Sequence, residues 1–204
     1  MRIVCLDLEG VLIPEVWINV AERTGIAELR LTTRDEPDYD KLMTHRLSIL
    51  DRHGLGLPKV QEVIDGMQPL PGAHEFLSAL RDRYQVIILS DTFYEFAAPF
   101  MRKLGMPTLF CHSLEVDQSG RIVSYLLRQA DQKRKAVSAL KGLNFKVVAA
   151  GDSYNDTSML GEAHAGILFR APDKVVAEFP QHPHVPHSYD DLRAAIDAAF
   201  ARLA

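Results

Sequence analysis

Two acidic residues follow an apolar run near the start of the chain. Asp7 and Glu9 lie at the carboxyl end of an apolar run at 3–8, which resembles a buried parallel strand, and Gly10 then allows the backbone to turn close to a ligand. Side chains alternate along an extended segment, so both carboxylates point to the same side, at the strand end that faces the binding crevice of α/β proteins. Two unpaired acids repel each other. We therefore expect a divalent cation to neutralise them, with one acid serving as nucleophile and the other as proton carrier.

A second apolar run, at 85–90, ends in Ser90 and Asp91 and is followed at once by a helical pattern. The hydroxyl of Ser90 and the amides after it would lie at a helix N-terminus, where anions bind. A serine in this position more often simply caps the helix. Taken alone, this segment does not decide between the two roles.

Three more oxygen-bearing side chains follow a third apolar run, at 146–150. Gly151 is followed by Asp152, Asn155 and Asp156. Carboxylate and amide oxygens are the ligands that Mg²⁺ prefers. The segment predicts a second set of metal ligands at a strand end.

Two lysines, Lys133 and Lys135, open the helical pattern that precedes this third run. Either ammonium group could supply a point charge for a phosphate and stabilise nearby carboxylates. Both could equally belong to a solvated basic helix face. Their spacing does not choose between them.

Strand and helix signals alternate along most of the chain, which predicts an α/β fold with a parallel sheet and right-handed crossovers. The predicted strands are 3–8, 85–90, 108–111, 146–150 and 165–169, and the predicted helices are 73–83, 93–104, 132–140, 157–163 and 190–203.

Two segments interrupt this alternation. Residues 14–69 show helical patterns at 15–24, 39–51 and 58–66 and no convincing strand, so we expect an inserted helical cap over a core made of 1–13 and 70–204. Residues 113–127 carry a hairpin signal around Ser119 and Gly120, which predicts a small β flap on the same rim.

Composition excludes several classes of function. A net charge of −4 in 204 residues argues against nucleic-acid and anionic-membrane partners, which require a basic surface. The two cysteines, Cys5 and Cys111, lie in apolar runs and are expected to be reduced, and no signal peptide or membrane span is evident, so we expect a cytoplasmic protein. The three histidines of 182–187 lie among prolines and are interpreted as surface residues rather than metal ligands.

Together, the strand-end Asp7 and Glu9, Ser90, Lys133, and Asp152 with Asn155 and Asp156 resemble the four motifs of the haloacid dehalogenase superfamily of phosphohydrolases, in the order that superfamily shows. The resemblance covers essentially the whole chain. It is strongest to the phosphoserine phosphatases, whose helical cap follows the first motif. It implies a Rossmann-like core with an inserted cap.

The resemblance also implies a mechanism. Asp7 would attack the phosphorus and form an aspartyl phosphate, while Glu9 would protonate the leaving alkoxide and then activate the acceptor. Mg²⁺ would be held by Asp7, the backbone carbonyl of Glu9 and Asp152, with Asp156 nearby. Ser90 and Lys133 would bind phosphoryl oxygens, with Asn155 at the same site.

In phosphoserine phosphatases an acidic residue just after the first motif holds the substrate amino group and a cap arginine holds its carboxylate. Glu15 and Arg46 match these positions. Tyr39 could form an apolar lid or simply pack within the cap, and we interpret Trp17 and Met43 as cap packing.

Two departures refine the resemblance. The second acid of the first motif is usually Asp, and here it is Glu9; the usual Ser-Gly-Gly appears as Ser90, Asp91 and Thr92. This combination is similar to the ThrH-type branch, the phosphoserine:homoserine phosphotransferases. It implies small-molecule substrates, phosphoserine and homoserine, and is compatible with a homodimer.

Three other functions were weighed. A phosphatase for another small phosphometabolite would share every motif. A phosphorylated signalling receiver also uses strand-end Asp, Ser or Thr, and Lys, but its phosphorylated Asp comes from a middle strand and it carries no cap. An inactive binding module is disfavoured because each chemical position is filled.

Overall fold

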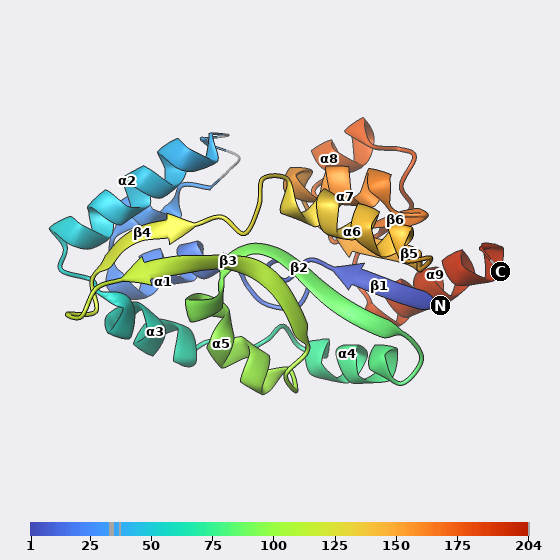
Figure 1. The fold of residues 1–204 in the computed structure, drawn as a ribbon, viewed down its shortest axis with the longest axis horizontal. Coiled ribbons are helices and arrows are strands. Elements are labelled where there is room, and N and C mark those ends of the chain that lie inside the picture. The colour runs from blue at the N-terminus through green and yellow to red at the C-terminus, as the bar shows by residue number, and fades with distance from the viewer. Residues whose placement is uncertain (33–34, 37, 204) are drawn as a thin grey trace.

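The computed structural model describes residues 1–32, 35–36 and 38–203 (Figure 1). Its centre is a twisted sheet with the strand order β4-β3-β2-β1-β5-β6-β7, parallel throughout except for the β3–β4 pair. The predicted α/β class with a mostly parallel sheet is confirmed. The strands are β1 (Arg2–Leu6), β2 (Gln85–Phe93), β3 (Thr108–Val116), β4 (Ile122–Leu126), β5 (Lys146–Gly151), β6 (Ala165–Phe169) and β7 (His184–Val185).

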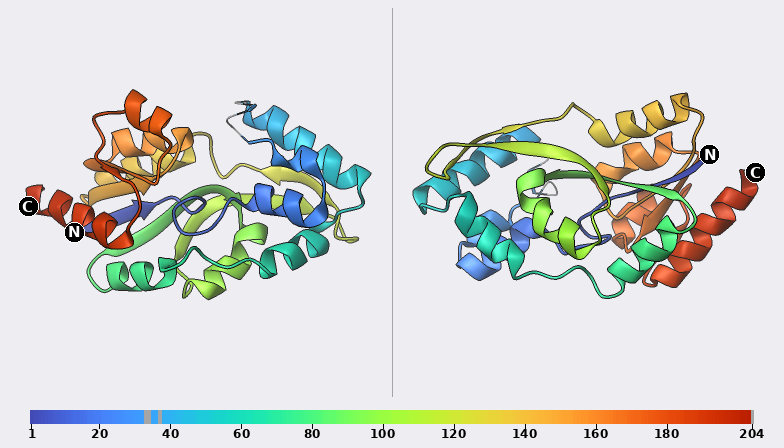
Figure 2. Two further views of the ribbon diagram at one scale, coloured as in Figure 1. Left: turned by 180° about the vertical axis from the view of Figure 1, so that it is seen from behind. Right: turned by 60° about the horizontal axis from the view of Figure 1, so that its bottom comes forward.

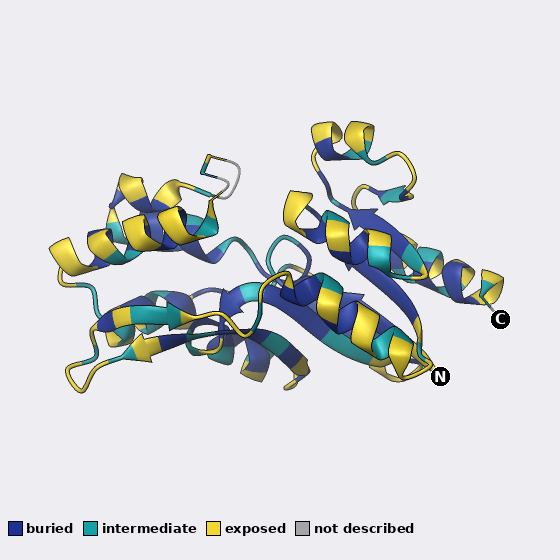
Figure 3. Cartoon of the chain, turned by 45° about the horizontal axis from the view of Figure 1, so that its top comes forward, coloured by how far each residue is buried: buried dark blue, intermediate teal, exposed yellow. Residues whose placement is uncertain are grey.

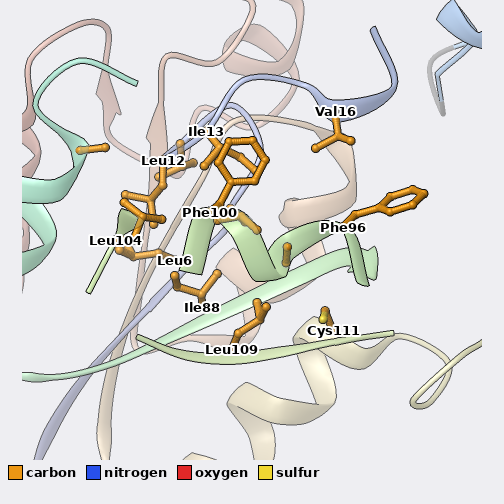
Figure 4. Close-up of a cluster of buried hydrophobic side chains, with 14 of the residues drawn as sticks. Leu6, Leu12, Ile13, Val16, Ile88, Phe96, Phe100, Leu104, Leu109 and Cys111 are labelled. Carbon is orange, nitrogen blue, oxygen red and sulfur yellow. The ribbon is translucent and has the colours of Figure 1, made fainter. Parts of the chain in front are cut away.

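The central strand β1 is apolar on both faces because helices cover both sides of the sheet. Its alternate residues enter two separate clusters, Val4 and Leu6 in one and Ile3 and Cys5 in the other. The first cluster, part of which Figure 4 shows, is closed by α4 (Ala73–Arg81), α5 (Tyr94–Lys103) and α9 (Tyr189–Arg202). The second is closed by α6 (Gln132–Gly142), α7 (Thr157–Glu162) and α8 (Asp173–Glu178).

The described part of the segment between β1 and α4 contains helices and no strand beyond a single bridge between Glu9 and Ile13. The helices are α1 (Val16–Thr24), the 3₁₀ turn η1 (Ala27–Arg30), α2 (Tyr39–Arg52) and α3 (Leu57–Asp65). Figures 1 and 2 show these helices gathered at one end of the molecule, together with the far end of the β3–β4 hairpin, while α6–α8 lie at the other end.

The hairpin pairs Ser113 with Leu126 and so matches the predicted flap at 113–127, but its first strand begins earlier, in the sheet. The predicted strand 108–111 and the first arm of the flap form one continuous strand, β3, which crosses from the sheet into the hairpin. Hydrogen bonds join the hairpin to the helices of residues 14–69: the Leu57 N–H donates to the Gly120 carbonyl at 2.7 Å, Arg121 Nε lies 2.6 Å from Asp51, and the Tyr125 hydroxyl bonds the Asp40 carboxylate. The flap and these helices therefore pack as one layer beside the crevice.

Other elements differ from the predictions in detail. The short helix α8 and strand β7 were not predicted, because both are too brief to show a period and lie among prolines. Figure 3 shows the sheet strands largely buried and the outer helix faces exposed. None of the helices in the described part of the chain combines the length and the apolar character that crossing a bilayer requires.

Candidate active site

The sheet order places β1, β2 and β5, the three strands that carry or precede the predicted site residues, side by side. β1 lies between β2 and β5, and the Asp7 N–H still pairs with the Ala150 carbonyl at 3.0 Å, so Asp7 and Asp152 end neighbouring strands. A cavity of about 500 Å³ opens at this edge, within the size range of small-molecule sites. All the predicted site residues except Asp156 line it: Asp7, Glu9, Glu15, Arg46, Ser90, Asp91, Lys133, Asp152 and Asn155. Asp156 lies fully buried below them.

Lys133 lies at the centre of the buried charges. Its Nζ donates to Asp7 Oδ1 at 2.9 Å and to Asp156 Oδ1 at 2.8 Å, and lies 3.6 Å from Asp91 Oδ2. Burial alone would lower the pKa of this ammonium, but the three carboxylates together hold its pKa well above the ordinary value. Lys135, on the same helix, is exposed. The structure thus distinguishes the two lysines that spacing leaves equivalent.

The carboxylates of Asp7, Asp152 and Asp156 form a buried triad whose ligand atoms all lie within 4.8 Å of one another. In the described residues it is the one group of three or more His, Cys, Asp or Glu side chains close enough to share an ion. Three hard oxygen donors with Lys133 as the cation in hydrogen-bond contact suit Mg²⁺, so the residues present fit the metal. The histidines of 182–187 contribute to no such group.

The triad requires a close approach of the backbone at Gly10. Gly10 has φ +76°, and a Cβ at this position would lie 2.5 Å from Asp152 Oδ2. Only glycine meets both conditions, since the left-handed conformation and the contact each exclude a side chain. Gly10 therefore makes room for the Asp152 carboxylate, which follows β5.

The surroundings of Asp7 disfavour its ionised form. Its side chain is buried, and burial followed by repulsion from Asp156 raises its pKa well above the ordinary value, against the opposing effect of Lys133. The fold therefore disfavours a negative charge on Asp7, and a cation beside the triad would stabilise that charge.

Glu9 occupies a different environment from Asp7, on the side of the cavity facing α1. Its Oε2 accepts a hydrogen bond from the Val16 N–H at 2.9 Å. Burial, with a further contribution from Glu15, raises the pKa of Glu9 to about 7, while Val16, Arg46 and Thr92 act in the opposite direction. Asp7, bonded by Lys133, and Glu9, bonded by the Val16 N–H, thus lie in different environments, and the pKa of Glu9 lies near neutrality.

Ser90 is buried within β2, which continues past the predicted end at residue 90 to Phe93, and its Oγ accepts from the Thr92 N–H at 3.3 Å. Ser90 does not cap the following helix, because the N-cap of α5 is Phe93, so the capping interpretation is wrong. Its place on the cavity wall is compatible with a role in binding an anion.

Asp91 is held from several elements at once. Its carboxylate accepts from Gln132 Nε2 at 3.2 Å and Asn155 Nδ2 at 3.3 Å and lies 3.6 Å from His112 Nε2, and the Tyr39 hydroxyl donates to its backbone carbonyl at 3.1 Å. Burial alone would raise its pKa, but Lys133 and these donors lower it below the ordinary range. Asp91 therefore remains ionised beside Lys133.

Asp156 stabilises the loop after β5 as well as the triad. Its Oδ2 accepts from the backbone N–H of Asp152 at 2.9 Å and of Ser153 at 3.1 Å, in a capping box that starts the 3₁₀ turn η2 (Tyr154–Asp156). The turn also places Asn155 against Asp91. One buried carboxylate thus fixes both the loop and the lysine.

Sequence reasoning did not identify His112 or Gln132 as part of the site. His112 lies in the middle of β3, with Nδ1 accepting from the Arg128 N–H at 3.1 Å and Nε2 facing Asp91. Gln132 Nε2 also donates to the Ser90 carbonyl at 2.6 Å. His112 directly follows the predicted strand 108–111 and Gln132 opens the predicted helix 132–140, but neither belongs to one of the four motifs.

Comparisons with known proteins agree with this geometry. The family model for haloacid dehalogenase-like hydrolases matches residues 1–164. The chain is 62% identical over 202 residues to phosphoserine phosphatase ThrH of Pseudomonas aeruginosa, covering 99% of this chain and 98% of the relative. A phosphoserine phosphatase of Pseudomonas syringae pv. tomato is 62% identical over 193 residues, covering 95% of this chain and 81% of the relative.

Solved structures give the same fold at lower identity. An apo phosphoserine phosphatase has a TM-score of 0.74 at 22% identity, covering 91% of this chain and 94% of that one. A phospho-aspartyl intermediate analogue of phosphoserine phosphatase has a TM-score of 0.77 at 21% identity, covering 97% and 98%. The chain therefore belongs to the haloacid dehalogenase-like hydrolases, in the family of the ThrH-type phosphoserine phosphatases.

Proposed function

We propose that this protein is a Mg²⁺-dependent phosphoserine phosphatase that also transfers the phosphoryl group to homoserine, through an aspartyl phosphate on Asp7. The observation that carries the proposal is the fixed position of Asp7 at the cavity wall, with Oδ1 bonded by Lys133 at 2.9 Å beside a second acid whose pKa is about 7. The names of the two 62% identical relatives support the substrate.

In the first half-reaction, an oxygen of Asp7 attacks the phosphorus, and the bond from phosphorus to the serine oxygen breaks. Glu9, protonated at this stage, gives its proton to the departing serine oxygen. Bound to the triad of Asp7, Asp152 and Asp156, with the Glu9 backbone carbonyl, Mg²⁺ would offset the repulsion between the phosphate dianion and the attacking carboxylate. Lys133 and Ser90 bind the phosphoryl oxygens, with Asn155 beside them.

In the second half-reaction, the deprotonated Glu9 takes a proton from the acceptor hydroxyl, whose oxygen attacks phosphorus and releases the Asp7 carboxylate. Water gives phosphate, and homoserine gives phosphohomoserine. Glu9 is one methylene longer than the usual Asp, so its carboxylate reaches further from the backbone toward α1, where the Val16 N–H anchors it. We infer that this placement favours an alcohol acceptor over water.

Residues 14–69 act as the cap in this proposal and select the substrate. Arg46 binds the substrate carboxylate, because a guanidinium pairs with a carboxylate through two parallel hydrogen bonds, and Glu15 binds the amino group. Both line the same cavity as Asp7. Tyr39, whose hydroxyl bonds the Asp91 carbonyl, joins the cap to the core at the cavity wall.

Phosphorus NMR of the protein with phosphoserine, Mg²⁺ and homoserine tests the proposal. We expect signals of both inorganic phosphate and phosphohomoserine, with the second absent when homoserine is omitted. Inorganic phosphate alone would reduce the function to hydrolysis. Unchanged phosphoserine, with turnover of other phosphoesters in a panel of small metabolites, would assign the site to another substrate.

The pKa of Glu9 predicts opposite pH dependences for the two half-reactions. Because Glu9 must be protonated to release serine, the single-turnover rate of Asp7 phosphorylation should fall about tenfold per pH unit above about pH 7. Dephosphorylation requires the ionised form and should fall below about pH 7 in the same way. Rapid-quench measurements of trapped aspartyl phosphate distinguish the two limbs. Rates that stay flat across this range would remove Glu9 from the proton-transfer role.

A further inference from the structure

The guanidinium of Arg46 is buried but only partly satisfied. The residue is 6% exposed, and its Nη2 donates to the Leu31 carbonyl at 2.8 Å while Nη1 lies 3.8 Å from the Met43 sulfur. Its buried Nε has no hydrogen-bond partner in the part of the chain that the structure describes. A buried charged donor without a partner is costly, which indicates that a ligand completes the site.

The indole ring of Trp17 lies against this guanidinium, with Arg46 Cζ 4.5 Å from a ring centroid. Trp17 is on α1 and Arg46 on α2, so the contact joins two helices of the cap. The ring of Phe96 of α5 packs against the indole in a T-shaped arrangement, with 5.4 Å between the ring centroids and an interplanar angle of 72°, and holds it from the core side. Trp17 also lines the same cavity as Asp7 and Arg46.

An aromatic ring offers something that a carboxylate could not offer at this position. A carboxylate against the guanidinium would occupy its donors and neutralise its charge, and a ligand would have to displace it. The face of an indole attracts the cation through its quadrupole, yet it accepts none of the donors. Arg46 is thereby held in place with its charge and its free N–H still available.

We propose that Trp17 is a positioning residue that holds Arg46 ready for a ligand carboxylate and so makes the enzyme selective for phosphomonoesters that carry one. The inference rests on the proposed function and extends it from Arg46 to the residue that orients it. It contrasts with the interpretation of Trp17 as cap packing. Packing alone would affect all substrates equally, whereas positioning affects those that engage Arg46.

Matched substrate pairs distinguish the two roles. Phosphoserine and phosphoethanolamine share the phosphoester and the amine, and only the first has a carboxylate. For Trp17→Leu we expect KM for phosphoserine to rise by about 10- to 30-fold, the value of a desolvated cation–π contact. We expect kcat to remain within about threefold and KM for phosphoethanolamine within about twofold. Trp17→Phe, which keeps an aromatic face, should lie between the parent and Trp17→Leu.

The control is Val20→Ala, which removes buried volume from the same helix at a residue away from the cavity. It should lower the unfolding midpoint without changing the ratio of the two KM values. In an Arg46→Met background, Trp17→Leu should add less than about a twofold further rise in KM for phosphoserine, because the two residues act as one unit.

Three results would overturn the inference. The first is that Trp17→Leu raises KM equally for phosphoserine and phosphoethanolamine, and the second is that Val20→Ala changes the ratio of the two KM values as Trp17→Leu does. The third is that the effects of Trp17→Leu and Arg46→Met on KM for phosphoserine are additive. Pairs with and without a carboxylate among other phosphomonoesters keep the test independent of phosphoserine itself. If the parent enzyme prefers the carboxylate-bearing member of another pair and does not hydrolyse phosphoserine, only the phosphoserine assignment is refuted. A parent that hydrolyses phosphomonoesters but shows no such preference would refute the role of Trp17.

Discussion

Asp7→Asn is expected to abolish phosphoserine turnover, with kcat reduced by at least about 10⁴-fold, because an amide cannot form the aspartyl phosphate. Phosphate release measures the loss, and hydroxylamine trapping of the acyl phosphate measures whether the intermediate forms. The parent should yield a trapped adduct on a peptide containing residue 7, and the variant should yield none. Transfer to homoserine should disappear together with hydrolysis, since both begin from the same intermediate.

The same substitution should leave the metal-free protein at least as stable as the parent at neutral pH. Burial and Asp156 raise the pKa of Asp7, so its ionised form is disfavoured in the fold, and a neutral isostere removes that cost. Thermal unfolding measures this directly. Asp152→Asn is the control for the loss of a carboxylate, because it removes another acid of the triad and keeps Asp7, the proposed nucleophile. Activity above about one per cent in Asp7→Asn, or a trapped adduct on another residue, would show that Asp7 is not the nucleophile.

The strand-end chemistry was predictable because it follows from topology. Asp7, Ser90 and Asp152 each end an apolar run, and the carboxyl ends of parallel strands meet at one edge of a sheet. The structure adds a role for two neighbouring glycines that the sequence does not reveal, since a Cβ at Gly10 or Gly151 would collide with Asp152 or Asp156. Local periodicity and one topological rule thus suffice to predict that Asp7, Ser90 and Asp152 meet at one edge of the sheet.

The contacts made by helices and by the interior of strands were not predictable in this way. Lys133 and Lys135 differ in burial only because of how α6 is rotated against the sheet, which two lysines in a charged segment do not reveal. His112 faces Asp91 because β3 continues past the expected strand end into the hairpin. These features depend on packing between distant segments, and packing sets the orientation of an element more than its own sequence does.

The cap illustrates the same limit. Matching of motifs places Arg46 correctly in the cavity, but the partial satisfaction of its donors and its contact with Trp17 come from the crossing of α1 and α2. Burial lowers the pKa of Arg46 to about 10, and Glu9 is the largest opposing influence. The charges of Arg46 and Glu9 are therefore electrostatically linked. Binding a carboxylate at Arg46 would weaken the support it gives to the ionised form of Glu9, which favours the protonated acid needed for the first half-reaction.

Lys133→Met should destabilise the metal-free protein by about 3–5 kcal/mol at neutral pH, the cost of leaving buried carboxylates without their cation. Because the pKa of Lys133 is raised in the folded protein, its contribution to folding stability is fully present below its ordinary pKa and is lost only as pH rises through the folded value. At neutral pH the parent protein therefore has the full stabilisation from Lys133. Without Lys133 the pKa of Asp7 rises further, so the variant's stability should fall as pH increases from about 5 to about 8. Urea unfolding at both pH values measures the effect.

Mg²⁺ should partly restore the stability of this variant and should not restore its activity. A divalent cation at the triad replaces the missing charge, so the rise in unfolding midpoint on adding Mg²⁺ should be larger in Lys133→Met than in the parent. Turnover stays low because no ammonium remains to bind a phosphoryl oxygen. Lys135→Met is the matched control on the exposed side of α6, and it should change neither stability beyond about 0.5 kcal/mol nor the response to Mg²⁺. Equal behaviour of the two variants would contradict the central place of Lys133, since only the buried lysine contacts Asp7 and Asp156.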